Sequence, residues 1–155
     1  MSTPLPPRLE FLTELRVMVE TPIDVGPAPT GHRRIIPITG GSLTGPALSG
    51  TVLPGGADFQ LLHSPELTEL DARYVIEAVD GALIHVHNSA LRHGAAADIA
   101  RLNRGDAVDP GAIYFRCSLR FSTASEAWGW LNHILAVGTG ERYPDSVKIA
   151  VFIVR

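Results

Sequence analysis

The stretch Arg73-Tyr-Val-Ile-Glu-Ala-Val-Asp-Gly-Ala-Leu-Ile-His-Val-His-Asn88 decides the fold class. Apolar and polar residues alternate on both sides of Asp80-Gly81, a dipeptide that favours a two-residue turn between antiparallel strands. Such a turn fixes the register, so that Arg73 lies opposite Asn88. The stretch therefore predicts a β-hairpin with Arg73 and Asn88 on one face and Tyr74 on the other.

The direction of each hairpin face decides which side chains meet in the interior. The face that carries Arg73 and Asn88 is the richer in β-branched residues, and we therefore expect it to point inward. The opposite face carries Tyr74, His85 and His87. If that face pointed inward instead, the interior would hold a histidine cluster. It would then lack the polar group that Arg73 and Asn88 are expected to form at the open end of the barrel.

The rest of the chain is punctuated in a way that predicts further short strands. Its 155 residues fit one domain, and 15 Gly and 12 Pro separate short segments with mostly alternating apolar residues. This spacing is typical of a sandwich or barrel. We predict a single all-β domain over residues 8–155, an antiparallel β-barrel with one or two short helices, preceded by a flexible leader over residues 1–7.

The other predicted strands follow from alternation. Phe11, Leu15, Val17 and Val19 share one face of the first strand. Pro37 indicates a sheet edge or a bulge, because proline cannot donate to a strand ladder. The remaining strands are expected over residues 32–38, 47–53, 57–63 and 112–121, with a terminal hairpin between 134–137 and 147–154.

Two segments predict helices. Residues 89–111 form a polar connection, within which Ala95 to Asn103 suits a short helix stopped by Gly105. Thr123-Ala-Ser-Glu126 matches a capping box, in which the Thr hydroxyl and the Glu carboxylate bond backbone donors at a helix start. A second short helix is therefore expected from Thr123.

Composition excludes several classes of partner. Thirteen Lys and Arg against 16 Asp and Glu give a net charge of −3, and the basic residues are scattered, which argues against nucleic-acid binding. No apolar run approaches the roughly 20 residues of a membrane-spanning helix, and no secretory signal is visible. The lone Cys117 cannot form an intrachain disulfide. We expect a soluble, cytoplasmic protein without membrane or nucleic-acid partners, in which a homodimer is plausible.

Motifs for metals, phosphates and covalent catalysis are missing. His85 and His87 would share one strand face, but a zinc site needs three or four convergent ligands and no third has suitable spacing. The glycines between Gly40 and Gly56 lack the Gly-Lys-Ser/Thr ending of a phosphate loop. No Gly-x-Ser-x-Gly elbow is present. We expect no metal and no cofactor.

The candidate site consists of polar residues set in apolar strand context. A buried polar group requires a partner, and several of them beside an apolar cavity are typical of a small-molecule site. We assign a proton shuttle to Asp58, binding of a carboxylate or enolate oxygen to Arg73 or Arg116, and hydrogen-bond donation to Tyr114 with Asn88 or Asn132. The predicted catalytic residues are Asp58, Arg73, Tyr114 and Arg116, and the predicted substrate-binding residues are Asn88, Trp130, Asn132 and Tyr74.

Two alternatives to these roles remain open. Asp58 and one arginine could form an internal ion pair that closes the barrel end. Trp128 and Trp130 suit core positions or plugs of the barrel end as well as a platform for a ligand.

The chain resembles the domain of unknown function 3237 family. The matching segments are Gly31-His-Arg-Arg-Ile-Ile-Pro-Ile38 with Gly40-Gly41, Gly45-Pro46, Leu53-Pro-Gly-Gly-Ala-Asp58, Leu70-Asp-Ala-Arg-Tyr74, Asp80-Gly81, Tyr114-Phe-Arg116 and Trp130-Leu-Asn132. The resemblance implies a one-domain antiparallel β-barrel with a central cavity and no established activity. Phe59 stands where tryptophan is expected, which would alter the pocket shape, and an Ala- and Arg-rich insert near residues 91–104 bears on ligand access.

Two functions fit these features. The first is a small-molecule-binding barrel enzyme that performs cofactor-free acid/base chemistry, such as isomerisation, cyclisation or lactone opening, on a hydrophobic acid or a polyketide-like or aromatic substrate. The alternative is a non-catalytic carrier that sequesters a small apolar ligand, as small barrels can do.

Overall fold

The computed structural model describes residues 2–155, and ten antiparallel strands dominate it. The strands are β1 (Leu9–Val19), β2 (Ile23–Ala28), β3 (Gly31–Thr44), β4 (Gly50–Val52), β5 (Ala57–Leu62), β6 (Leu67–Ala78), β7 (Leu83–His93), β8 (Tyr114–Thr123), β9 (Ala136–Arg142) and β10 (Ser146–Val154). One α-helix, α1 (Ala96–Asn103), and two 3-10 turns, η1 (Pro110–Ala112) and η2 (Gly129–His133), join them.

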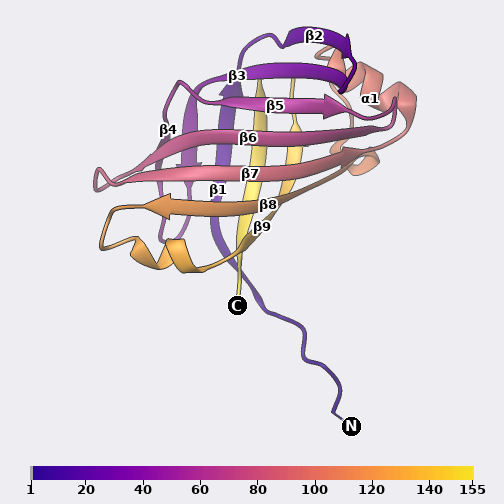
Figure 1. The fold of residues 1–155 in the computed structure, drawn as a ribbon. Helices are drawn as coiled ribbons and strands as arrows, with labels where there is room; N and C mark the ends of the chain where they lie inside the picture. Colours follow the sequence, from indigo (N-terminus) through magenta and orange to yellow (C-terminus); the bar gives the residue numbers. More distant parts are fainter. Residues whose placement is uncertain (1) are drawn as a thin grey trace.

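The sheet closes on itself because β1 pairs with β10 on one side and with β3 on the other. Both β4 and β5 lie between β3 and β6, so they share one position in the ring. The closed ring therefore has eight strand positions, and the predicted antiparallel β-barrel is confirmed. In Figure 1, β3 and β5 to β8 run across the front of the barrel, and β1 and β9 cross behind them.

Strand β3 has two partners in succession along each edge. Its residues 38–44 pair with β1, and its residues 31–35 pair with β2. The β1 ladder shifts register between Val19 opposite Ile38 and Met18 opposite Gly40, next to Pro37. The bulge indicated by Pro37 is therefore present. Among the described strands β2 pairs with β3 alone, so the barrel wall is incomplete beside β2.

The β6–β7 hairpin has a longer turn than the sequence predicts. Val79, Asp80 and Gly81 form a three-residue loop, in which the Ala78 amide donates to the Ala82 carbonyl at 2.9 Å and Gly81 has a φ of +89°. A type I turn followed by a left-handed glycine is the usual three-residue hairpin. The predicted two-residue turn is wrong, and the register moves by one residue.

This shift changes the inner face of β6 but not that of β7. Arg73 lies opposite His87, and Tyr74 lies opposite Val86. Tyr74 and Asn88 are buried, whereas Arg73 is exposed on the outside. The inward prediction was therefore wrong for Arg73 and right for Asn88. His85 and His87 do not enter the barrel, so no interior histidine cluster forms.

A bulge in β1 also changes which residues of the first strand point inward. A register shift between Phe11 and Thr13 adds one residue to β1, which turns Leu12 inward. Phe11 leaves the face of Leu15 and packs outside against Phe152, with 5.6 Å between ring centroids.

The predicted second helix does not form at Thr123. This residue still belongs to β8, and its hydroxyl donates to the Leu83 carbonyl at 2.7 Å. Because the strand holds Thr123, only the short turn η2 follows. The first predicted helix is present as α1 and ends before Gly105, whose φ is +88°. Within residues 2–155, no helix is both long and apolar enough to cross a membrane.

Candidate functional site

The barrel encloses a cavity that opens into a groove at one end. The enclosed part has a volume of about 40 Å³ and mostly apolar walls, including Val17, Ile36, Ile38, Leu70 and Ile149. The groove has a volume of about 540 Å³ and lies between β2, α1 and the β9–β10 turn. Val19 and Arg142 line both spaces. The enclosed space is thus the size of a single small chemical group, and the groove is much larger.

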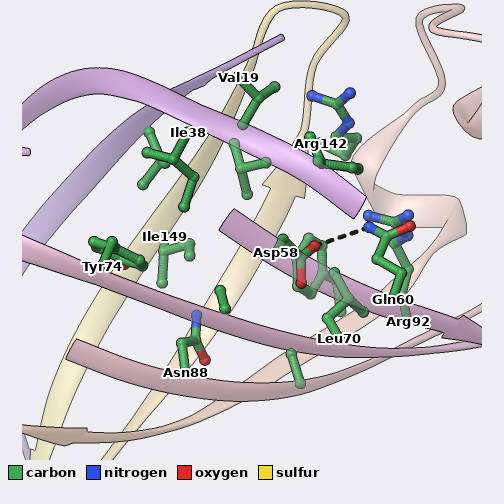
Figure 2. A pocket seen from close by; sticks show the side chains of 16 residues that line it. Val19, Ile38, Asp58, Gln60, Leu70, Tyr74, Asn88, Arg92, Arg142 and Ile149 are labelled. Atoms are coloured by element: carbon green, nitrogen blue, oxygen red, sulfur yellow. Dashed lines mark hydrogen bonds between the residues drawn. The ribbon is translucent and has the colours of Figure 1, made fainter. Parts of the chain in front are cut away.

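Asp58 is the carboxylate of the cavity (Figure 2). It lies on β5, and its two oxygens accept separate hydrogen bonds: Oδ2 from Gln60 Nε2 at 2.9 Å and Oδ1 from the Asp71 amide at 3.1 Å. The exposed part of this half-buried side chain faces the cavity. Burial raises the pKa of Asp58, although the bond from Gln60 and the charge of Arg92 oppose the increase. A carboxyl group in this state can give and take a proton.

Several polar atoms around Asp58 have no hydrogen-bond partner within residues 2–155. They are Gln60 Oε1, Tyr74 OH, Asn88 Oδ1 and Arg92 Nε, four of the seven buried side-chain atoms in this condition. Burial raises the pKa of Tyr74, so its phenol stays neutral and can donate. Buried polar groups are normally satisfied, and a local concentration of unsatisfied ones marks a site for water or a polar ligand.

Three buried arginines lie at this end of the barrel: Arg92 and Arg142 line the cavity, and Arg34 and Arg142 line the groove. Arg92 from β7, Arg34 from β3 and Arg142 from β9 have relative exposures of 2%, 6% and 9%. Burial lowers the pKa of Arg92 to about 10 and lowers the pKa values of Arg34 and Arg142, while the charge of Asp58 acts against each decrease. All three remain charged at neutral pH.

The internal ion pair that the sequence left open is not formed. Within residues 2–155, no guanidinium nitrogen lies within 4.0 Å of an Asp58 oxygen. Asp58 and the buried arginines therefore attract one another across the cavity without direct contact.

The predicted site residues divide into three groups. Asp58, Tyr74 and Asn88 line the cavity together. Arg73, Tyr114 and Arg116 lie on the outer surface and do not line this cavity. Arg73 pairs there with Asp71 at 3.4 Å, and Arg116 lies over the Tyr114 ring at 5.3 Å. The outer position of Arg73 follows from the hairpin register.

Trp130 and Asn132 lie outside the cavity, in and beside η2. Asn132 accepts from the Thr123 amide at 2.8 Å and donates to the Thr123 carbonyl at 3.0 Å, which anchors η2 to β8. Trp130 packs against the core, and the neighbouring Trp128 bonds Asp80 at 3.0 Å. Both tryptophans therefore pack against the core at this end of the barrel and do not line the cavity.

Gln60, Arg34, Arg92 and Arg142 were not expected from the sequence. Strand parity could have found two of them, since Arg34 shares a face with Ile36 and Ile38 and Arg92 shares one with Asn88. Arg92 was missed because residues 89–111 were predicted to be a connection, whereas β7 continues to His93.

Two expectations about pocket shape also change. Phe59 points outward and is 48% exposed, so the residue type there does not shape the cavity. The segment near residues 91–104 contributes Arg92 to the cavity and Asn103 to the groove.

Within residues 2–155, no group of three or more His, Cys, Asp or Glu side chains is placed to hold a metal ion.

Comparison with known proteins identifies the family. The family model described as "Protein of unknown function (DUF3237)" matches residues 7–154. This chain belongs to that family. A UPF0311 protein of Rhodopseudomonas palustris is 48% identical over 122 residues, which cover 79% of this chain and 80% of that protein.

A solved structure and an enzyme are also similar to this chain. The crystal structure of a conserved protein of unknown function from Rhodopseudomonas palustris has a TM-score of 0.91 and 39% identity, covering 99% of this chain and 100% of that one. The hydroalkoxylation enzyme phnH of Penicillium herquei is 30% identical over 138 residues, which cover 89% of this chain and 77% of that enzyme. The DUF3237 barrel thus has an enzyme among its relatives.

Proposed function

We propose that this protein is an acid/base enzyme that adds a hydroxyl group across a carbon–carbon double bond within one small, hydrophobic, oxygen-containing molecule. The observation that carries the proposal is Asp58, a carboxyl group with a raised pKa, held by two hydrogen bonds inside a cavity whose walls are mostly apolar. The Penicillium relative is named as a hydroalkoxylation enzyme, and hydroalkoxylation is a reaction of this type.

One carboxyl group suffices for the reaction. Protonated Asp58 gives its proton to one alkene carbon, and the substrate hydroxyl oxygen bonds to the other carbon as the double bond is lost. The hydroxyl proton then passes to the Asp58 carboxylate, which restores the acid. The product is a cyclic ether with the same atoms as the substrate, so no oxidant, reductant or co-reactant is consumed.

The unsatisfied polar atoms support this chemistry by orienting the substrate. Tyr74 OH donates and Asn88 Oδ1 accepts, and both line the cavity with Asp58. Figure 2 shows Asp58 between Tyr74 on one side of the cavity and Gln60 with Arg92 on the other. Holding the hydroxyl oxygen and the alkene in reacting geometry would contribute to the rate, because cyclisation requires both to approach one carboxyl group.

Turnover of ortho-prenyl phenols and hydroxyl-bearing alkenes tests the proposal. Reactions run in deuterium oxide should give a cyclic ether with one deuterium on the carbon that receives the proton. Asp58→Asn should reduce the rate about 100-fold or more, since general acid/base groups contribute roughly 10²–10⁴-fold. Asp98→Asn, the same change on the outer helix α1, is the matched control and should keep the wild-type rate.

Two outcomes would overturn the proposal. The first is that no compound of the panel reacts faster with the wild-type protein than with Asp58→Asn. The second is that the protein retains such a compound unchanged, whether or not Asp58 is intact, which is the behaviour of a carrier.

A further inference from the structure

The three buried arginines are more than folding requires. A buried guanidinium is costly unless it is paired, and structural arginines in cores are normally bonded to a carboxylate or to several carbonyls. Arg142 donates one bond, to the Ser146 carbonyl at 3.3 Å. Arg34 and Arg92 donate no side-chain hydrogen bond within residues 2–155, and Arg92 Nε is fully buried.

The arginines also repel one another. The charges of Arg34 and Arg142 both help to lower the pKa of Arg92, and the charge of Arg34 helps to lower that of Arg142. Asp58 is the carboxylate that opposes all three effects. Asp24 also opposes the decrease at Arg34, and Asp145 opposes the decrease at Arg142, whereas Asp58 is the carboxylate that acts on Arg92. When Asp58 is protonated, the charge of Arg92 therefore has no counter-charge beside it.

Other carboxylates near the groove are already engaged. Asp24 accepts from His32 at 2.6 Å and from the Gly26 amide at 2.9 Å. Asp145 accepts from the Ser146 hydroxyl at 3.1 Å. Neither is within 4.0 Å of a buried guanidinium within residues 2–155. These two carboxylates act on Arg34 and Arg142 at a distance, and within residues 2–155 no carboxylate contacts the Arg92 guanidinium.

We propose that the ligand of this cavity is an organic oxyanion, a carboxylate or a phenolate or enolate, on an otherwise hydrophobic molecule. The proposal rests on the proposed function in placing the reacting ligand beside Asp58. Arg92 binds the oxyanion at the inner end, and Arg142 and Arg34 line the path from the groove. Arginine is suited to this role because its planar donors match a carboxylate in pairs.

The walls favour an organic anion over an inorganic one. Apolar residues such as Ile36, Leu70 and Ile149 form most of the enclosed surface, so the carbon skeleton of the ligand gains from burial. Inorganic phosphate would gain charge contacts only. Bound next to Asp58, an organic anion would also raise the pKa of that carboxyl group and keep it protonated, which is the state that donates to an alkene.

Isothermal titration calorimetry at low salt with acid and ester pairs tests the inference. The probes are benzoate, cinnamate and 2-naphthoate, the methyl ester of each, and inorganic phosphate. At least one carboxylate should bind about tenfold or more tightly than its ester and than phosphate. Arg92→Gln, Arg142→Gln and Arg34→Gln should each weaken it about tenfold or more, as expected for a lost charge-assisted bond. Arg120→Gln, on the exposed face of β8, should bind as the wild type does.

Equal affinity for acid and ester, no binding by any acid, or unchanged binding by all three arginine variants would overturn the inference. If Arg92→Gln does not fold, judged by circular dichroism, the less buried Arg34 and Arg142 variants decide. Asp58→Asn separates this inference from the proposed function, because it should still bind the carboxylate while turnover is lost. Carboxylate binding without Asp58-dependent turnover would therefore reject the proposed function alone.

Discussion

The Arg92 guanidinium lies over the ring of Phe115, with 5.5 Å between Cζ and the ring centroid. Phe115 in turn packs against Gly140, where an added Cβ would lie 2.7 Å from three ring atoms. The absence of a side chain on β9 thus sets the position of a ring on β8, and this ring supports a charged side chain on β7. Packing between strands is thereby linked to the geometry of the candidate site.

Gly140→Ala should destabilise the protein and weaken carboxylate binding. The extra methyl group would force the Phe115 ring to move, and overpacking of this kind costs about 1–3 kcal/mol. Urea unfolding and calorimetry with 2-naphthoate measure the two effects. Gly129→Ala is the matched control, because no atom lies within 4 Å of its added Cβ. Equal stability of the two variants would contradict the steric reason.

Arg92→Met should stabilise the ligand-free protein. A buried guanidinium that no carboxylate contacts is costly to desolvate, and an apolar side chain of similar length removes that cost. Thermal unfolding should give a higher midpoint than the wild type, whereas Arg120→Met on the surface should change stability by less than about 0.5 kcal/mol. A large loss of stability would show that Arg92 serves the fold.

Asp58→Asn should become more stable relative to the wild type as the pH increases. Burial raises the pKa of Asp58 in the folded state, so the folded protein holds this proton more tightly than the unfolded chain does. The resulting stabilisation is complete below the unfolded pKa, near 3.8, and is lost as the pH rises through the folded value. Urea unfolding of both proteins from pH 3 to pH 8 measures the difference. An opposite slope would mean that the folded state favours the carboxylate.

Asn132→Ala should reduce stability without affecting ligand binding. Its side chain bonds both the amide and the carbonyl of Thr123, and loss of these bonds costs on the order of 1 kcal/mol. The affinity for 2-naphthoate should stay at the wild-type value, because Asn132 lies outside the cavity. Weaker binding with unchanged stability would restore the substrate-binding role predicted from the sequence.

Local patterns predict the barrel well because each strand carries its own alternation, and Asp80-Gly81 marks a real hairpin. They fail where one extra residue changes which strand face points inward. With the three-residue loop at Gly81, Tyr74 points into the interior and Arg73 does not. With the bulge after Phe11, Leu12 points into the interior and Phe11 does not. Such shifts depend on how neighbouring strands pair, which a single strand does not encode.

The site was predicted in part for a related reason. Asp58 and Asn88 lie in apolar alternation and were recognised, whereas Arg92 was missed because residues 89–111 were predicted to be a polar connection, while β7 continues to His93. The position of Arg92 is unusual for a structural residue, and disagreement between residue type and location is expected where a protein binds a ligand. Arg92 lies four residues after Asn88 and therefore on the same strand face, and this charged residue in an inward position was the most informative signal that the sequence offered.

The incomplete wall beside β2 affects how a ligand is exchanged. Since β2 pairs with β3 alone among the described strands, the groove there is bordered by side chains and turns rather than by a continuous ladder. If the cavity binds a ligand as proposed, we expect that ligand to enter or leave by rotation of side chains such as Arg142, with no backbone hydrogen bond broken. Amide protons of the ladders should then keep their protection against hydrogen exchange while ligand dissociates, and the dissociation rate should be independent of the unfolding rate.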